Sequence, residues 1–277
     1  MPLPTRRLLA VLALGTALVL GACSSDDDSA APPGSDGAPS ATAADTVPAD
    51  EVLRIVVTND DGVGAEGIDV LVTALEALPD VEVTVVAPAE NQSGTADQTS
   101  PEPPTPTDAE TASGHPAVAV PGFPADAVVA ALDQGVADAP HLVVSGINEG
   151  QNIGPLSELS GTVGAARTAV RRGVPAVAVS QGFADEPDYD AAADLVVEWV
   201  EANRMALVDG TANLVVISIN VPTCPDGPRD VVDVPTAADD GGVNLLEVDC
   251  ASALTDPTTD VEAFVHGFAT RSDVGTG

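Results

Sequence analysis

The chain has 277 residues, with 43 aspartates and glutamates against nine basic residues, all of them arginine, for a formal net charge of −34 at pH 7. So acidic a composition excludes a protein that binds nucleic acid through a basic face. It also repels anionic substrates at long range, so a phosphate site would need positive charge from a metal ion, helix N-termini or a few arginines.

The first 23 residues have the pattern of an export signal. Arg6 and Arg7 form a basic start, residues 8–20 an apolar run, and residues 20–23 a small-residue cleavage site. The sequence Leu-Gly-Ala-Cys at that site resembles a bacterial lipobox, which implies cleavage before Cys23 and a diacylglyceryl group on its sulfur. We therefore expect an exported lipoprotein, membrane-anchored on the outer face of the cytoplasmic membrane. An uncleaved signal that remains as an anchor is the alternative.

Composition divides the rest of the chain into three parts. Residues 24–50 contain mostly Ser, Asp, Ala, Pro and Gly, too little apolar surface to bury a core, and are expected to be a disordered tether. Residues 51–222 are long enough for one α/β domain. Residues 223–277 are irregular and rich in Pro and Gly, and we expect a C-terminal arm or hairpin layer there.

Apolar runs of strand length alternate with helical patterns in the expected domain. The strands are expected at residues 53–57, 81–87, 117–120, 141–145, 176–180 and 214–219. Helices are expected from Ile68, near Pro124, from Ser160 and around Trp199, while residues 95–115 form a polar, Pro-rich excursion. Strands that are apolar throughout and alternate with helices predict an α/β fold with a Rossmann-like, three-layer, mostly parallel sheet.

Polar residues gather where three of these strands end. The first strand leads into residues 59–62, which include Asp60 and Asp61, and two later strands lead into residues 87–94 and 145–154. Doubly wound sheets bind ligands at the edge where such strand ends meet. Adjacent carboxylates repel each other, and a hard cation such as Mg²⁺ or Mn²⁺ removes that cost. The alternative for the two acids is a helix N-cap followed by a first-turn acid.

A second phosphate-binding feature is the helix start at Ser160-Gly161-Thr162. Free amides at a helix N-terminus form an anion site, and a glycine there lets a phosphate approach closely. A plain Ser N-cap on a tightly packed helix is the alternative. Residues 62–67 also fit the dinucleotide pattern G-x-G-x-x-G, but the paired acids and the lack of an acidic residue after the second strand count against it.

Cys224 and Cys250 remain besides Cys23. In an oxidising compartment outside the cytoplasm, an even pair of cysteines favours a disulfide. Both are too isolated from other metal ligands to form a zinc site, so we expect a structural role.

Taken together, these segments resemble the stationary-phase survival protein SurE family, metal-dependent nucleotidases with a Rossmann-like core. The matching stretches are residues 57–62, 86–94, 122–126, 144–154, 160–166, 173–180 and 220–222, in the family order. Three positions depart from the family pattern: Ala127 stands where a cysteine is usual, Leu159 where an aromatic residue commonly precedes the Ser-Gly-Thr turn, and Glu66 where a proline is frequent.

The resemblance implies a set of site residues. The catalytic pair would be Asp60 and Asp61. The ligands of a divalent Mg²⁺ or Mn²⁺ ion would be Asp60, Asp61, Ser93 and Asn148. The residues facing the substrate phosphate would be Asn59, Asn152, Ser160, Gly161 and Thr162. The resemblance also implies a homodimer or tetramer formed through the C-terminal arm.

The function expected from these features is a 5′/3′-nucleotidase, a hydrolase that releases phosphate from nucleoside monophosphates. Metal ions in such sites activate water for attack on phosphorus, and Asp60 is expected to orient that water. The alternative is a lipid-anchored solute-binding protein that serves a transporter. It accounts for the lipid signal and the α/β pattern but gives no reason for adjacent acids at a strand end.

Overall fold

The structure is a computed structural model and describes residues 52–277. The expected signal peptide, lipid site at Cys23 and tether lie outside the described residues. Six parallel strands form the centre of one sheet: β1 (Leu53–Thr58), β2 (Val81–Pro88), β4 (Pro116–Val120), β5 (Leu142–Glu149), β6 (Ala176–Gln181) and β7 (Val216–Val221). With three further strands in the described residues, the order is β3-β4-β2-β1-β5-β6-β7-β9-β8.

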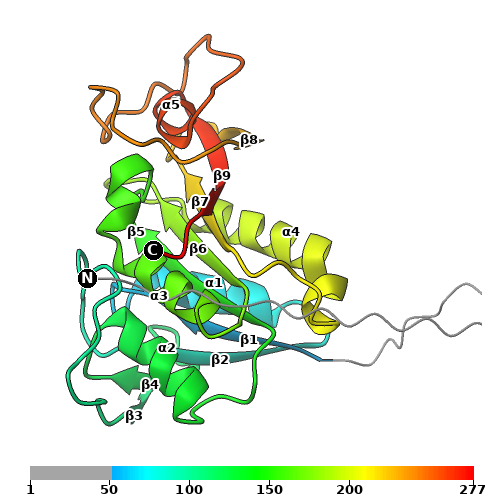
Figure 1. The fold of residues 1–277 in the computed structure, drawn as a ribbon. Coiled ribbons are helices and arrows are strands. Elements are labelled where there is room, and N and C mark those ends of the chain that lie inside the picture. The colour runs from blue at the N-terminus through cyan, green and yellow to red at the C-terminus, as the bar shows by residue number, and fades with distance from the viewer. Residues whose placement is uncertain (1–51) are drawn as a thin grey trace, which may run out of the picture. The chain divides into compact units, whose positions relative to one another are not determined.

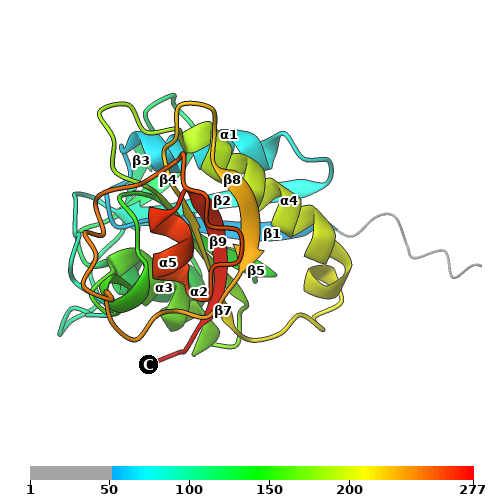
Figure 2. The ribbon, with the colours of Figure 1, turned by 90° about the horizontal axis from the view of Figure 1, so that it is seen from above.

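Four helices cover this sheet in two layers: α1 (Glu66–Glu76), α2 (Pro124–Asp133), α3 (Gly161–Val170) and α4 (Tyr189–Val208). The apolar sides of α1 and α4 pack in one core and those of α2 and α3 in another. Figure 2 shows the two pairs on opposite sides of the strands. None of the helices in residues 52–277 is long and apolar enough to cross a bilayer.

Strand β1 shows why this sequence needs both layers. Its residues are apolar on both faces, and successive side chains of a strand point to opposite sides. Ile55 and Val57 belong to the α1–α4 core, whereas Val56 between them belongs to the α2–α3 core, and all three are almost fully buried. The predicted α/β class and the three-layer, mostly parallel sheet are therefore confirmed.

The expected elements agree with the structure to within a few residues, with two exceptions before the C-terminal part. β5 runs past residue 145 to Glu149, so it carries part of the expected loop. The excursion at residues 95–115 contains a short strand, β3 (Thr107–Glu110), that pairs antiparallel with β4. A strand of Thr, Asp, Ala and Glu lacks the apolar alternation that would have indicated it.

The C-terminal part is joined to the core sheet and does not form a separate layer. It contains β8 (Arg229–Asp233), α5 (Asp260–Val265) and β9 (Phe268–Val274), coloured orange to red in Figure 1. β9 pairs antiparallel with β7, and β8 pairs with β9. The expected disulfide between Cys224 and Cys250 is present and ties the segment after β7 to the loop before α5.

Strand order places the candidate site. β2 lies on one side of β1 and β5 on the other, so the loops that follow β1 and β5 leave the sheet where the chain reverses its direction of winding. Such a switch point is where open α/β sheets bind ligands. Residues 59–62, 89–94 and 150–154 follow the carboxyl ends of β1, β2 and β5.

Removal of the disulfide should destabilise the protein measurably. The cysteines are 26 residues apart, a separation for which loop closure contributes about 3 kcal/mol. We expect Cys224→Ala/Cys250→Ala to lower the free energy of unfolding in urea by this amount. A reductant should lower the stability of the wild type similarly and leave the double variant unchanged. An equal stability of both proteins would contradict a structural role.

Candidate metal centre at the carboxyl edge of the sheet

The loop after β1 holds two aspartates in a fixed turn. Asn59 closes the turn, because its Nδ2 donates to Gly62 O (2.9 Å) and its Oδ1 accepts from Gly62 N (3.2 Å). Gly62 has a φ of +103°, and a Cβ there would lie 3.1 Å from the backbone of Glu90. The turn therefore requires glycine, and it delivers Asp60 and Asp61 next to the loop that follows β2.

Asp61 joins the loops after β2 and β5. Its Oδ1 accepts a hydrogen bond from Asn91 Nδ2 (3.2 Å), and its Oδ2 accepts one from the backbone N–H of Glu149 (3.1 Å). The backbone of Asp60 adds a second tie, since its carbonyl accepts from Gln92 N (2.7 Å). Three polar clusters that are far apart in the sequence thus meet at one place, as predicted.

Asp60 faces the start of α3. It is 2% exposed, and its Oδ1 accepts a hydrogen bond from Thr162 Oγ1 at 2.5 Å. A Cβ on Gly161 would come within 2.8 Å of Asp60 Cβ, so glycine lets the carboxylate lie against the helix N-terminus. The positive end of the helix dipole stabilises a negative charge at this position.

The electrostatics of the pair are unfavourable without a cation. Burial raises the pKa of Asp60, although Thr162 and the nearby amides oppose the shift. Burial and then the charge of Asp60 raise the pKa of Asp61 to about 7. The same negative field reaches Tyr189, whose pKa is raised by burial and by Glu149, Asp61 and Glu66. A divalent cation between the carboxylates would reverse both effects on the acids.

Ser93 and Asn148 are each linked to Asp61 through one other residue, Ser93 through Asn91 and Asn148 through the adjoining Glu149. Ser93 is exposed, and its N–H donates to Asn91 Oδ1 (3.0 Å), while Asn91 donates to Asp61. Asn148 lies at the end of β5, directly before Glu149. Its Nδ2 donates to the carbonyl of Gly150, which leaves Oδ1 as the atom of this side chain suited to a cation.

The residues expected to face the substrate phosphate divide into two groups. Gly161 and Thr162 lie at the α3 N-terminus beside Asp60, and Ser160 is the N-cap, with its Oγ accepting from Val163 N (3.0 Å). Asn59 and Asn152 are engaged elsewhere. Asn59 closes its own turn and is fully buried.

Asn152 is part of a buried polar network at the ends of β6 and β7. Its Nδ2 donates to Ser180 Oγ (2.8 Å), and its backbone N–H donates to Asn220 Oδ1 (2.7 Å). One of the two side-chain N–H groups of Asn152 and its backbone N–H thus hold the loop after β5. The structure gives Asn152 a positioning role, and contact with phosphate remains a prediction for it.

Sequence reasoning missed two residues that hold the site together. Asn91 links Asp61 to the loop of Ser93, and it lies within the polar cluster that was singled out. Asp260, at the start of α5, is 2% exposed and accepts from Gly154 N (2.8 Å) and Ala237 N (2.7 Å). A lone aspartate in an irregular tail carries no sequence signal for that contact.

The oxygen donors fit a hard divalent cation. In residues 52–277, no group of three or more His, Cys, Asp or Glu side chains is arranged to hold a metal ion. A cation at Asp60 and Asp61 would therefore take its other protein ligands from neutral oxygens such as those of Ser93 and Asn148. Two carboxylates with neutral oxygen ligands are a donor set that Mg²⁺ and Mn²⁺ accept.

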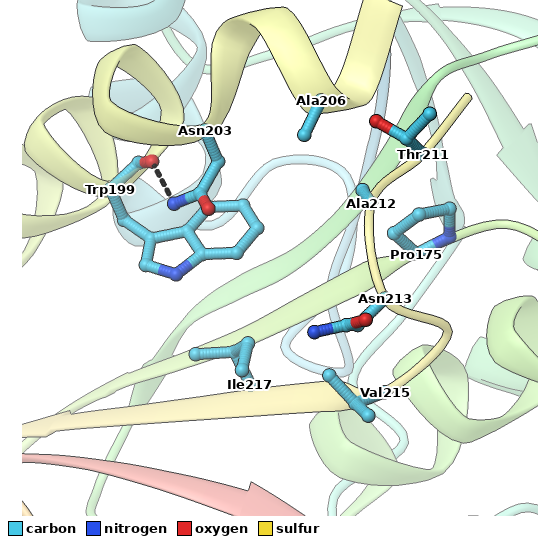
Figure 3. A pocket seen from close by; sticks show the side chains of 9 residues that line it. All are labelled: Pro175, Trp199, Asn203, Ala206, Thr211, Ala212, Asn213, Val215 and Ile217. Carbon is cyan, nitrogen blue, oxygen red and sulfur yellow. Dashed lines mark hydrogen bonds between the residues drawn. The ribbon is translucent and has the colours of Figure 1, made fainter. Parts of the chain in front are cut away.

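A cavity of about 200 Å³ lies at the opposite edge of the sheet. Figure 3 shows Trp199 and Asn203 of α4 lining it, with Ile217 of β7 among the other walls. One of the two amide side chains that line it is engaged, because Asn203 Nδ2 donates to Trp199 O (2.7 Å). No acidic, basic or histidine side chain lines this cavity. The carboxyl edge, where Asp60 and Asp61 lie, is therefore the better candidate for a catalytic site.

Fold and site together define an α/β protein with a candidate metal centre at the switch point of a mostly parallel sheet. The model of the family described as Survival protein SurE matches residues 55–238. The chain therefore belongs to the SurE family, as its motifs predicted.

Relatives and a solved structure agree with this assignment. The chain is 39% identical over 184 residues to 5′-nucleotidase SurE 1 of Burkholderia lata, covering 65% of this chain and 66% of that protein. It is 36% identical over 195 residues to 5′-nucleotidase SurE of Methanopyrus kandleri, covering 67% and 72%. The crystal structure of the SurE protein from Aquifex aeolicus matches with a TM-score of 0.65 at 23% identity, over 81% of this chain and 94% of that one, which shows a shared fold.

The raised pKa of Asp61 predicts how stability changes with pH in metal-free protein. Its carboxyl keeps a proton in the folded state up to about pH 7 but loses it near pH 4 when unfolded. The stability that the protonated carboxyl gives the folded state is therefore fully present below pH 4 and is lost as pH rises through 7. We expect Asp61→Asn, measured with chelator, to raise the melting temperature relative to wild type more at pH 8 than at pH 5. A difference that is the same at both pH values would contradict the shift.

Proposed function

We propose that the protein is a metal-dependent phosphomonoester hydrolase that acts as a 5′/3′-nucleotidase on nucleoside monophosphates. The observation that carries the proposal is the pair of adjacent carboxylates, Asp60 buried and Asp61 half-buried, held by three loops and a helix start at the switch point of the sheet. Relatives named 5′-nucleotidase SurE support it, although the matches span 66% and 72% of the length of the first two of them.

In this proposal, Asp60, Asp61, Ser93 and Asn148 hold one Mg²⁺ or Mn²⁺ ion. When bound, the ion supplies positive charge to the phosphate oxygens and makes water a stronger acid. The residues around it supply geometry. Asn91 and the N–H of Glu149 fix both oxygens of Asp61, so the carboxylate does not turn away from the site.

Asp60 and the α3 N-terminus act on the reacting groups. Water attacks phosphorus, the bond from phosphorus to the ribose oxygen breaks, and the nucleoside leaves with a proton on that oxygen. Asp60 orients the water by accepting a hydrogen bond from it. The N–H groups at Gly161 and Thr162 bind phosphate oxygens as charge shifts between them.

We also propose that the protein is exported and held at the outer face of the cytoplasmic membrane by lipid on Cys23. The supporting observations are the lipobox-like sequence and the Cys224–Cys250 disulfide, a bond typical of oxidising compartments. Residues 1–23 would be the signal, 24–50 the tether, 51–222 the nucleotidase core and 223–277 the arm. No observation favours a solute-binding function over the nucleotidase.

A homodimer or tetramer formed through the C-terminal part completes the proposal. Leu246 and Val243 in this part are 64% and 44% exposed, although both are apolar. Burial of such side chains against a second copy would be favourable.

Neutralising either aspartate should abolish catalysis without unfolding the protein. Asp60→Asn and Asp61→Asn each keep the side-chain shape but remove a charge that a cation needs. Substitution of a residue that only hydrogen-bonds to a metal ligand typically lowers metal affinity or activity roughly 10–100-fold. Substitution of a ligand itself should therefore lower Mn²⁺-dependent phosphate release from AMP by more than that. The matched control is Asp194→Asn on the exposed side of α4. Unchanged turnover in either site variant, with native circular dichroism, would refute the assignment.

The lipid anchor is tested separately, in whole cells. Cys23→Ala should prevent incorporation of labelled fatty acid and shift the protein from the membrane to the soluble fraction, because the sulfur is the only proposed point of attachment. Nucleotidase activity per molecule of the full-length protein should not change. A Cys23→Ala protein that stays in the membrane fraction would favour an uncleaved signal as the anchor.

A further inference from the structure

Phe183 is an exposed aromatic side chain in a protein that has few aromatics. Its side chain is 57% exposed, and it is the one aromatic among the exposed large apolar residues of the described chain. It follows β6 at the carboxyl edge of the sheet, the same edge as the paired acids. A single exposed apolar residue needs no explanation, so its exposure alone carries no argument.

The surroundings of Phe183 are more informative. The ring lies over Gly150, because a Cβ at Gly150 would come within 2.3 Å of ring carbon Cζ. Gly150 belongs to the loop of the candidate site, two residues after Asn148. The residue between them, Glu149, donates its N–H to Asp61 Oδ2. A short run of backbone therefore connects the ring to the acid pair.

The backbone that carries the ring is held firmly. Gly182 N donates to Val221 O (2.7 Å), and Gly182 O accepts from Thr223 Oγ1 (3.0 Å). Phe183 N donates to Gln151 Oε1 (3.3 Å), which ties it to the site loop directly. The structure thus presents an exposed ring on a fixed support, and a preorganised group loses little entropy when a ligand binds.

We propose that Phe183 is the platform on which the base of the substrate stacks, and that it sets the preference for nucleotides over other phosphomonoesters. The inference rests on the proposed function for its class of substrate. Each nucleobase has a flat face, so stacking on an aromatic ring binds any of the four without a hydrogen-bond code. The larger face of a purine gives it the advantage over a pyrimidine.

Stacking also suits the charge of this molecule. An acidic surface repels the phosphate of a nucleotide at long range, whereas contact between a base and a phenyl ring is insensitive to that field. Leu159, 62% exposed just before the α3 N-cap, is the other exposed large apolar residue next to the site's segments. It is aliphatic, so it offers no ring face for a base.

The test compares a substrate that has a base with one that lacks it. Initial rates are measured with Mn²⁺ for AMP and for ribose 5-phosphate, using wild type, Phe183→Ala and Phe183→Tyr. We expect Phe183→Ala to raise KM for AMP about tenfold, within the range for loss of one base–aromatic stack. Its kcat for AMP and both constants for ribose 5-phosphate should remain those of wild type, and Phe183→Tyr should restore KM for AMP.

The matched control is Leu214→Ala, another exposed apolar truncation, located before β7 at the opposite edge of the sheet. It should leave all four constants unchanged. Calorimetric titration with AMP and with ribose 5-phosphate gives a readout that does not depend on turnover. Wild type should bind AMP more tightly, and Phe183→Ala should bind the two compounds alike.

The outcomes separate this inference from the proposed function. If Phe183→Ala binds and hydrolyses AMP as wild type does, or if wild type binds AMP no more tightly than ribose 5-phosphate, the platform is refuted while the nucleotidase stands. If wild type binds AMP through Phe183 but releases no phosphate from either compound, the platform stands and the hydrolase proposal fails.

Discussion

The repulsion between two neighbouring carboxylates, one buried and one half-buried, is the constraint on which the candidate site depends. Asp60 and Asp61 follow one strand directly, and burial raises the pKa of both. Hydrogen bonds from Asn91, Thr162 and the Glu149 N–H hold the two carboxyl groups in place. The concentrated negative charge favours the binding of a cation at this point of the surface. Metal binding there would be coupled to the release of protons.

The C-terminal part supports this site from outside the parallel core. Asp260 accepts from Gly154 N, and Leu245 O accepts from Gln151 Nε2 (2.5 Å), so two residues of the C-terminal part hold the loop that follows Asn148. Phe264 of α5 also approaches the loop of Phe183, since a Cβ at Gly182 would lie 2.9 Å from its ring. The C-terminal part, which has the weakest sequence pattern, therefore helps to hold the loop after Asn148, which belongs to the candidate site.

The sequence predicts the parts of the fold that follow from local patterns. Strands such as residues 53–57 are apolar throughout, and parallel order then brings Asp60, Asp61 and Asn148 to one edge. Hydrogen bonds between residues that are far apart in the sequence cannot be predicted from such local patterns. The bonds of Asn152 to Ser180 and Asn220, which lie 28 and 68 residues away, are examples that no local pattern indicates. β9 contains the consecutive polar residues Thr270, Arg271, Ser272 and Asp273, so its insertion beside β7 depends on tertiary pairing that no local pattern indicates.

The arginines show why the charge at the site has to come from another source. The chain has nine, and with Arg6 and Arg7 outside the described residues seven remain, each with a structural partner. Five bind carboxylates outside the site, on Glu158, Asp97, Asp133, Glu201 and Asp233. The other two, Arg54 and Arg229, bind the backbone carbonyls of Ala139, Leu254 and His266. With its basic side chains engaged in this way, the described chain leaves a cation and the α3 amides as the sources of positive charge for a phosphate. Base stacking on Phe183 then adds affinity for the nucleotide that the acidic surface does not oppose. The metal ion and the helix start would bind the phosphate, and the ring would bind the base.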